Sequence, residues 1–309
     1  MTRNSLRRTP KPAIAVVLTA ALALGAFAAL ARGGGGATAA KPHVVIGTKN
    51  FTEQYVLGQL YKKALEAKGY KVTLKQDIGS SELIDTAFKS GKINFYPEYI
   101  GVLVVDIAKR KLPSTAAGTW AAAKAFESAK RHGTVLKMTP FSDTDSFGML
   151  TTTAKKLRVK TIPDMKKVKS FSFAGFPECR TRLTCLVGLK RVYGLTQTRF
   201  VPLGGISVYT LLDKHKVTAG DVFSTDPQLE GKKYTVLRDT KHLFGFQNVA
   251  PIVSKKVLAA GGPRFANVVN AVSAKLTVPA MRAMNKAVAI DKQSPAAVAE
   301  AFLKANGLG

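Results

Sequence analysis

The segment from His43 to Gly101 constrains the fold of this chain more than any other, because its hydrophobic pattern alternates between two periods. It opens with the apolar run HVVIG, which is typical of a buried parallel strand. The expected elements are, in order, a strand at 43–47, a helix between Thr52 and Gly69, a strand at 71–75, a helix between Ser80 and Gly91, and a strand at 93–96. This order predicts one half of an α/β ligand-binding fold.

The loops that follow these strands are predicted to meet. Parallel strands joined by right-handed crossovers bring their following loops to one edge of the sheet. We therefore expect Thr48–Asn50, Gly79–Ser81 and Glu98–Gly101 to share a rim. Two of these loops also lead into helices, whose N-termini favour a negatively charged group.

Six motifs in the chain resemble a known family when taken in order. They are TKNFTEQ, IGSSEL, YPEYIG, PECRTRLTCLVGLKRVYGL, VFSTDPQL and VLRDTKHLFGFQNVAPIV. The family is that of the substrate-binding proteins of quaternary-amine and osmoprotectant ABC importers, which carry glycine betaine, choline or carnitine. The resemblance covers nearly everything after residue 42. It implies an α/β, type II periplasmic-binding-protein fold, with two lobes, a ligand cleft and two chain crossings.

The expected lobes are both built from this part of the chain. About 270 residues remain after the N-terminal segment, which suits two lobes better than one small core. We expect lobe one to comprise 42–142 plus 247–309, and lobe two to comprise 143–246. The chain would cross between them near Ser142–Ser146 and Phe244–Asn248.

Residues 1–39 have the pattern of an export signal. Basic residues precede an apolar run from Ala13 to Leu30, and small residues follow it. The alternative is an N-terminal anchor that is retained, because the run approaches membrane-spanning length. With either outcome we expect an exported protein, in the periplasm or on the outer face of the cytoplasmic membrane.

The chain is strongly basic, with 47 Lys and Arg residues against 19 Asp and Glu and a formal net charge of +28. Nucleic acid is nevertheless not an expected partner, because the basic residues are spread along the chain and no binding motif accompanies them. An anionic cell envelope is one candidate partner. A merely solvated surface explains the same charge.

The resemblance implies a cage of aromatic rings for the ligand. Tyr99, Phe147, Phe223 and Phe246 match the family's cage positions. A quaternary ammonium group has no N–H to donate, so proteins hold it by cation–π attraction to ring faces. The alternative for each Phe is ordinary core packing.

The resemblance also assigns polar residues to the cleft. Lys49 and Arg182 match positions that contact a ligand carboxylate, and their charges suit that role. Gln54 and Asp145 match polar positions that line the pocket. Val102 departs from the pattern, because several relatives have a hydroxyl or carboxylate there. The alternative is that Lys49 and Arg182 are simply two of the many basic surface residues.

The chain has two cysteines, Cys179 and Cys185, on either side of Arg182. In an exported protein two nearby cysteines usually pair, so we expect a disulfide that holds the Arg182 loop. Two free buried thiols are the alternative. We expect no metal site, because the four histidines are scattered without ligand spacing, and no cofactor.

These observations predict a receptor rather than an enzyme. The chain lacks GxSxG, P-loop and HExxH motifs, and Asp143 and Asp145 have no evident catalytic partner. We expect a monomeric binding protein that delivers a betaine-type solute to an ABC permease and its ATPase. Choline or another trimethylammonium or sulfur-containing betaine is the alternative ligand. A basic polyanion-binding surface protein without a transport role is the alternative from another class.

Overall fold

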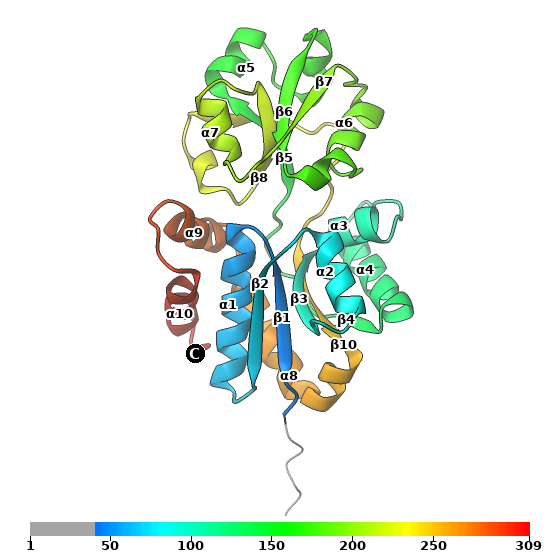
Figure 1. The fold of residues 1–309 in the computed structure, drawn as a ribbon, viewed down its shortest axis with the longest axis vertical. Helices are drawn as coiled ribbons and strands as arrows, with labels where there is room; N and C mark the ends of the chain where they lie inside the picture. Colours follow the sequence, from blue (N-terminus) through cyan, green and yellow to red (C-terminus); the bar gives the residue numbers. More distant parts are fainter. Residues whose placement is uncertain (1–40) are drawn as a thin grey trace, which may run out of the picture. The chain divides into compact units, whose positions relative to one another are not determined.

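The computed structural model describes residues 41–309, so the expected signal peptide or anchor at 1–39 lies outside the described residues. The described part contains two separate five-stranded sheets. Each sheet is covered by helices and forms the centre of one lobe, as Figure 1 shows. In this part of the chain, no helix combines the length and apolarity needed to cross a membrane. The α/β, two-lobed architecture predicted from the sequence is confirmed.

The first sheet has the strand order β2-β1-β3-β10-β4. Its strands are β1 (Val44–Lys49), β2 (Val72–Gly79), β3 (Phe95–Tyr99), β4 (Gly133–Val135) and β10 (Val249–Ser254). β1 pairs in parallel with both β2 and β3, whereas β10 runs antiparallel to β3 and β4. The strand–helix–strand–helix–strand unit is therefore present, and the carboxyl ends of its three strands lie at one edge.

The helices of the first lobe come from both ends of the described chain. They are α1 (Thr52–Ala67), α2 (Ser81–Lys89), the short α3 (Ile100–Val102), α4 (Ala116–Lys130), α8 (Lys255–Lys275), α9 (Val278–Ala289) and α10 (Pro295–Ala305). A buried core joins α1 to α8, α9 and α10 on one face of the sheet, through residues such as Leu57, Phe265 and Met281. A second core, around Ile84 and Phe126, lies beneath α2 and α4. The two cores hold the sheet edge that carries the loops in a rigid frame.

The second sheet has the strand order β7-β6-β8-β5-β9. Its strands are β5 (Asp145–Leu150), β6 (Phe171–Gly175), β7 (Thr198–Pro202), β8 (Ala219–Phe223) and β9 (Tyr234–Val236). The helices around it are α5 (Thr151–Leu157), α6 (Leu186–Tyr193) and α7 (Val208–Asp213). β6 and β8 are parallel, so the loops after Gly175 and Phe223 leave from the same edge.

Two chain segments connect the sheets, one between β4 and β5 and the other between β9 and β10 (Figure 1). They lie side by side, because Ser142 and Asn248 form an antiparallel bridge. The Asp143 N–H donates to the Gln247 carbonyl at 3.1 Å, and the Gln247 N–H donates to Ser142 Oγ at 3.0 Å. The connection is therefore a hydrogen-bonded pair of strands.

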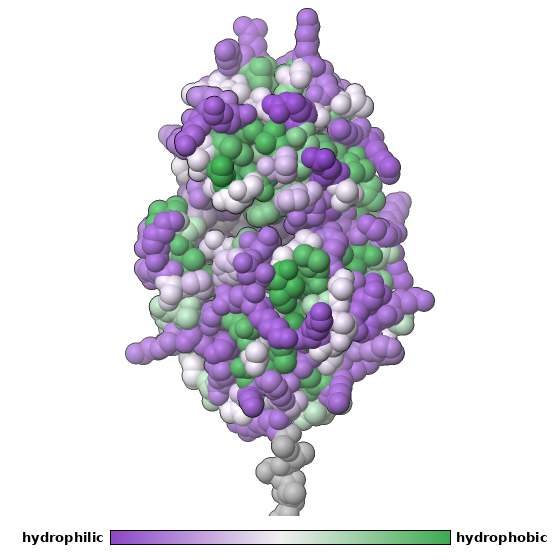
Figure 2. Space-filling view, viewed as in Figure 1, coloured by the Kyte–Doolittle hydropathy of each residue, from purple (hydrophilic) through white to green (hydrophobic). Residues whose placement is uncertain are grey.

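On the face drawn in Figure 2, hydrophilic residues predominate, and groups of hydrophobic residues are exposed on both lobes. Exposed large apolar side chains include Leu83, Ile206 and Ile290. Exposed apolar side chains are common on folded proteins.

Candidate binding site between the two lobes

A pocket lies where loops from both sheets meet, and its cavity volume is about 40 Å³. Its lining residues are Lys49, Asn50, Phe51, Ser80, Ser81, Tyr99, Val102, Asp143, Asp145, Phe176, Glu178, Arg182, Phe223 and Gln247. The first sheet contributes residues from each of the three rim loops expected from the sequence. The second sheet contributes the loop after β6, the end of β8 and the start of β5.

Four aromatic rings gather at this pocket, and we call them the aromatic wall: Phe51, Tyr99, Phe176 and Phe223. Phe51 is at the centre, with its ring centroid 6.0 Å from that of Tyr99 and 6.1 Å from those of Phe176 and Phe223. The Phe51 and Phe223 rings are nearly parallel, at 3°. Phe176 and Phe223 are 6.2 Å apart. The rings thus come from both lobes and present a continuous apolar surface.

Phe147 is not part of this wall, which corrects one of the expected cage positions. Its side chain is fully buried in the core of the second lobe. There its ring lies 5.9 Å from Phe171 and 5.0 Å from Phe173. Phe147 lies on the face of β5 that packs against the core of this lobe, which includes Phe173, Ile162 and Leu189, so the ordinary alternative for a Phe in an α/β protein holds here.

Phe246 also lies elsewhere. It lines a different hollow beside the chain connections, together with Leu112, His242 and Phe244. Phe246 belongs to the segment that returns from lobe two to lobe one, and this segment leaves its ring outside the main pocket. Two of the four expected cage rings, Tyr99 and Phe223, line the pocket.

Phe51 and Phe176 were missed by the sequence reasoning. Phe51 directly precedes α1, and Phe176 directly follows β6. Both stand in loops that follow a buried parallel strand, which is the rule that located the rim. Applying that rule to FAGFPEC, and to every residue of KNFTEQ, could have found them.

Lys49 lies in the pocket but already has a partner. It is 3 % exposed, and its ammonium lies 2.8 Å from Glu98 Oε1 and donates to the Pro97 carbonyl at 3.1 Å. The same ammonium is 4.8 Å from the centroid of the Tyr99 ring. Burial lowers the pKa of Lys49, although Glu98 opposes this effect. Lys49 is therefore held by lobe one itself.

Arg182 also lines the pocket, and it is paired across the lobes. Its Nε donates to Glu82 Oε1 at 3.1 Å, and its Nη2 donates to Glu82 Oε2 at 2.9 Å. Glu82 is in the first turn of α2, in the first lobe. The hydrogen bonds and charge of Arg182 lower the pKa of Glu82 to about 2, against the effect of burial. The two residues are 100 positions apart in the sequence.

Asp145 belongs to a group of buried acids behind Arg182. Burial raises its pKa to about 6, and the charge of Asp106 adds to this effect, whereas Arg182 opposes it. Asp106 accepts hydrogen bonds from the Leu183 N–H at 2.9 Å and from Thr184 Oγ1 at 2.5 Å. These acids leave the pocket without a net excess of positive charge.

Gln54 and Val102 lie close to the pocket in different ways. Gln54 is fully buried behind the lining, with its Oε1 3.5 Å from the Lys49 backbone nitrogen. Val102 lines the pocket, and its N–H donates to Gln247 Oε1 at 3.0 Å. Gly101 makes this contact possible, because a Cβ at that position would lie 2.6 Å from Gln247 Nε2. Gln247 is thus a lining residue that the motifs did not indicate.

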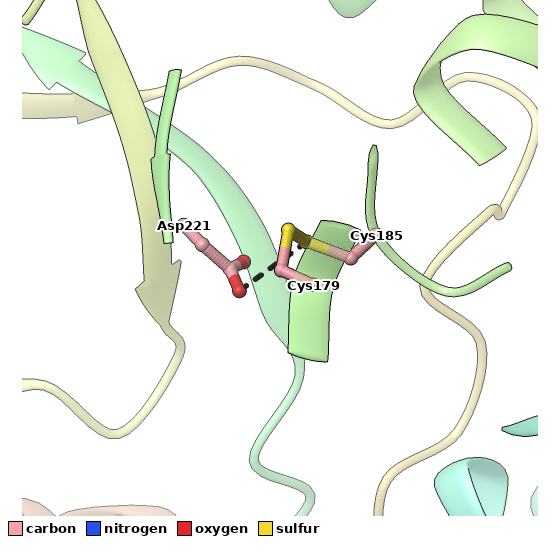
Figure 3. A group of neighbouring side chains, drawn as sticks. All are labelled: Cys179, Cys185 and Asp221. Carbon is pink, nitrogen blue, oxygen red and sulfur yellow. Dashed lines mark hydrogen bonds between the residues drawn. A yellow bond between two sulfur atoms is a disulfide. The ribbon is translucent and has the colours of Figure 1, made fainter. Parts of the chain in front are cut away.

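Cys179 and Cys185 are joined by a disulfide, drawn in Figure 3 beside Asp221. Cys185 Sγ lies 3.5 Å from Asp221 Oδ2. A disulfide sulfur carries no hydrogen, so this contact is favourable when the carboxyl is protonated. Burial raises the pKa of Asp221 well above its ordinary value, which is consistent with that state. Because both sulfurs are used in the bond, this group of sulfur and carboxylate atoms lacks the thiolates that a metal would need.

Taken together, two lobes, a pocket between them and rings from both lobes define a two-lobed solute-binding receptor. Residues 42–305 match the family model described as the substrate-binding domain of ABC-type glycine betaine transport systems, and the chain belongs to this family. It is therefore a receptor of an ABC transport system and not an enzyme.

Relatives and solved structures agree with this assignment. The chain is 33% identical over 278 residues to a glycine-betaine-binding protein of Pseudomonas aeruginosa, covering 85% of this chain and 88% of the relative. It is 27% identical over 277 residues to the ergothioneine transport permease/ergothioneine binding protein EgtU of Helicobacter pylori, covering 86% of this chain and 48% of that protein. A solved structure of a glycine betaine/carnitine/choline ABC transporter protein matches the fold with a TM-score of 0.69 at 23% identity, covering 86% of this chain and 99% of that one. None of these comparisons supports the alternative of a polyanion-binding surface protein.

Proposed function

We propose that this receptor binds a quaternary-ammonium solute of the betaine type against the aromatic wall and delivers it to an ABC permease. The observation that carries the proposal is the meeting of Phe51, Tyr99, Phe176 and Phe223 at one pocket. A methylated cation is attracted to ring faces within about 6 Å. Because the four rings contact one another, they form a wall on one side of the ligand.

The charges around the pocket also suit a cationic headgroup. Lys49 and Arg182 are neutralised by Glu98 and Glu82, while Asp145 and Glu178 line the pocket. Burial raises the pKa of Asp145 to about 6, and when this carboxyl is ionised it adds negative potential near the headgroup. A ligand carboxylate would reach Arg182 only by competing with Glu82. This pairing favours a second candidate, a choline-like ligand that brings no carboxylate.

A ligand panel tests the proposal. Isothermal titration calorimetry of the mature protein would compare glycine betaine, choline, carnitine and ergothioneine with glycine and alanine. We expect one or more of the methylated compounds to bind, and the primary amino acids to bind at least tenfold more weakly. Equal affinity for glycine and glycine betaine would contradict the proposal.

The remaining parts of the proposal concern location and assembly. We infer an exported monomer that works with a permease and an ATPase, as the family description of a transport system suggests. We assign lobe one to 42–142 plus 247–309 and lobe two to 143–246, with the paired segments around Asp143 and Gln247 as the hinge. Genes for a permease and an ATPase next to the gene for this chain would support the transport role.

A further inference from the structure

A buried group of polar side chains joins the two lobes beside the pocket. Its members are Glu53 in the first turn of α1, Tyr99 at the end of β3, Asp143 in the chain connection, Thr225 after β8, and Asn285 in α9. Each is at most 6 % exposed. Only Tyr99 and Asp143 line the pocket, so most of this group lies behind it.

Thr225 is placed between two carboxyl groups. Its Oγ1 lies 2.6 Å from Glu53 Oε2 and 2.7 Å from Asp143 Oδ1. A threonine hydroxyl has one hydrogen, so it can donate to only one of these oxygens. The second short contact is a hydrogen bond only if the other carboxyl carries a proton and donates it to Thr225 Oγ1.

From this geometry we propose that Glu53 and Asp143 share a single proton through Thr225, and that these residues position the Tyr99 side of the aromatic wall against lobe two. This inference rests on the proposed function for its ligand. It adds a positioning role for residues that make up no part of the aromatic wall.

The surroundings favour the proton on Asp143 and the charge on Glu53. Glu53 accepts from the Tyr99 hydroxyl at 2.9 Å and from Asn285 Nδ2 at 3.0 Å, in addition to Thr225. Three donors stabilise an ionised carboxylate. Asp143 also accepts the Thr225 N–H at 3.1 Å. The chain of donors then runs from Asp143 through Thr225 to Glu53, and the Tyr99 hydroxyl points to the same carboxylate.

The neighbouring charged groups agree with one retained proton. Burial raises the pKa of both Glu53 and Asp143, and the charge of Glu53 further opposes ionisation of Asp143. Asp226, on the Thr225 loop, adds to this effect. Arg282 of α9 donates to the Ser224 carbonyl at 2.7 Å, and its charge partly opposes the rise in the pKa of Asp226 that burial causes.

The lobes are linked at this point by several contacts of the same loop. Arg282 and Asn285 hold the Ser224 and Thr225 carbonyls from α9, and Thr225 reaches Glu53 on α1. Phe223 of the aromatic wall directly precedes this loop. The hydrogen bonds that need the shared proton therefore fix Tyr99 of lobe one and Phe223 of lobe two relative to each other.

The test uses Glu53→Gln, which removes the carboxylate that carries the charge in this arrangement. The glutamine oxygen still accepts from Tyr99, and without the charge of Glu53 the remaining acid, Asp143, can ionise and accept from Thr225 Oγ1. Glu66→Gln, on the same helix but partly exposed and paired with Lys62, is the matched control. Asp143→Asn provides a second variant that removes the other carboxyl, should Glu53→Gln fail to fold.

The first measurement needs no ligand. Urea unfolding between pH 5 and pH 9 gives the free energy of unfolding at each pH. The slope of this free energy against pH is set by the difference in the number of bound protons between the folded and the unfolded state. We expect wild type and Glu66→Gln to retain about one proton more than Glu53→Gln on folding at neutral pH. Identical slopes for wild type and Glu53→Gln would overturn the shared proton.

The second measurement follows glycine betaine and choline affinity over the same pH range. Above the pH at which the shared proton dissociates, the affinity of the wild-type protein for these ligands should fall by up to about tenfold per pH unit. The affinity of Glu53→Gln should not depend on pH in this way. Equal pH profiles would overturn the positioning role. If wild type binds no quaternary amine at any pH, the proposed function fails, while the unfolding slopes still decide the shared proton.

Discussion

The guanidinium of Arg182 in lobe two and the carboxylate of Glu82 in lobe one face each other in a two-point pair, at 3.1 and 2.9 Å. The side chain of Arg182 is 15% exposed, and Glu82 is more accessible, at 41%. Arg182 lines the pocket, whereas Glu82 is not among its lining residues. The pair uses the guanidinium edge that a ligand carboxylate would otherwise take.

Replacing Glu82 by Gln should therefore change ligand preference. Without the competing carboxylate, Arg182 is free to form a charge-assisted pair with a ligand carboxylate. We expect the ratio of glycine betaine affinity to choline affinity to rise by about tenfold, the scale of one such pair. Calorimetry with both ligands measures the ratio. Glu66→Gln, whose carboxylate pairs with Lys62 outside the pocket, is the control and should leave the ratio unchanged.

The two groups of phenylalanines should respond differently to substitution. Phe176→Ala removes a ring of the aromatic wall and should weaken binding of a trimethylammonium ligand by about 1–2 kcal/mol. Phe147→Ala instead leaves a hole in the core of the second lobe and should lower the free energy of unfolding by about 3–5 kcal/mol. Urea unfolding and titration of the folded fraction separate the two effects. A Phe147→Ala protein of unchanged stability would contradict the core placement.

Because the carboxyl of Glu127 is buried, its ionisation should lower the free energy of unfolding as the pH rises. Glu127 is fully buried, and within the described residues its Oε2 has no hydrogen-bond partner. Burial raises its pKa from 4.5 to about 8, with a further contribution from Asp85. The folded state thus binds a proton that the unfolded state has already released.

Between pH 4.5 and 8 this difference corresponds to a loss of at most about 5 kcal/mol of stability. Glu127→Gln should abolish that loss, so the variant should be more stable than wild type at pH 8 and close to it at pH 4.5. Urea unfolding at the two pH values checks the sign. If Glu127→Gln were more stable than wild type by the same amount at pH 4.5 and at pH 8, titration of Glu127 would not be the cause of the pH dependence.

The disulfide should matter more for the pocket than for the fold. The loop between Cys179 and Cys185 is short, so closing it accounts for about 2 kcal/mol of stability. The same loop carries Arg182 and its contact with Glu82. We expect reduction to lower the unfolding free energy by this amount and, because the Arg182 loop loosens, to weaken ligand binding by more than about thirtyfold, which exceeds 2 kcal/mol. A double Cys→Ala variant that binds as wild type does would contradict this role.

Several features of the site follow from the sequence alone. Buried apolar runs, helical spacing and glycine stops between His43 and Gly101 determine β1, α1, β2, α2 and β3, because local periodicity selects each element. Right-handed crossovers then bring Lys49, Ser80 and Tyr99 to one edge of the sheet. The two cysteines stand close enough in the chain for their pairing to be expected.

Only the tertiary structure decided which side chains reach the pocket. A motif position identifies a residue type and does not place its side chain. The burial of Phe147 depends on the elements that pack around β5. The position of Phe246 depends on the path of the chain segment that leads back from lobe two to lobe one. The pairing of Glu82 with Arg182 depends on how the two lobes meet, since the residues are 100 positions apart. The contact of Thr225 with Glu53 and Asp143 has the same origin. Interactions between distant segments carry no periodic signal, and the fold alone places these groups within hydrogen-bonding distance.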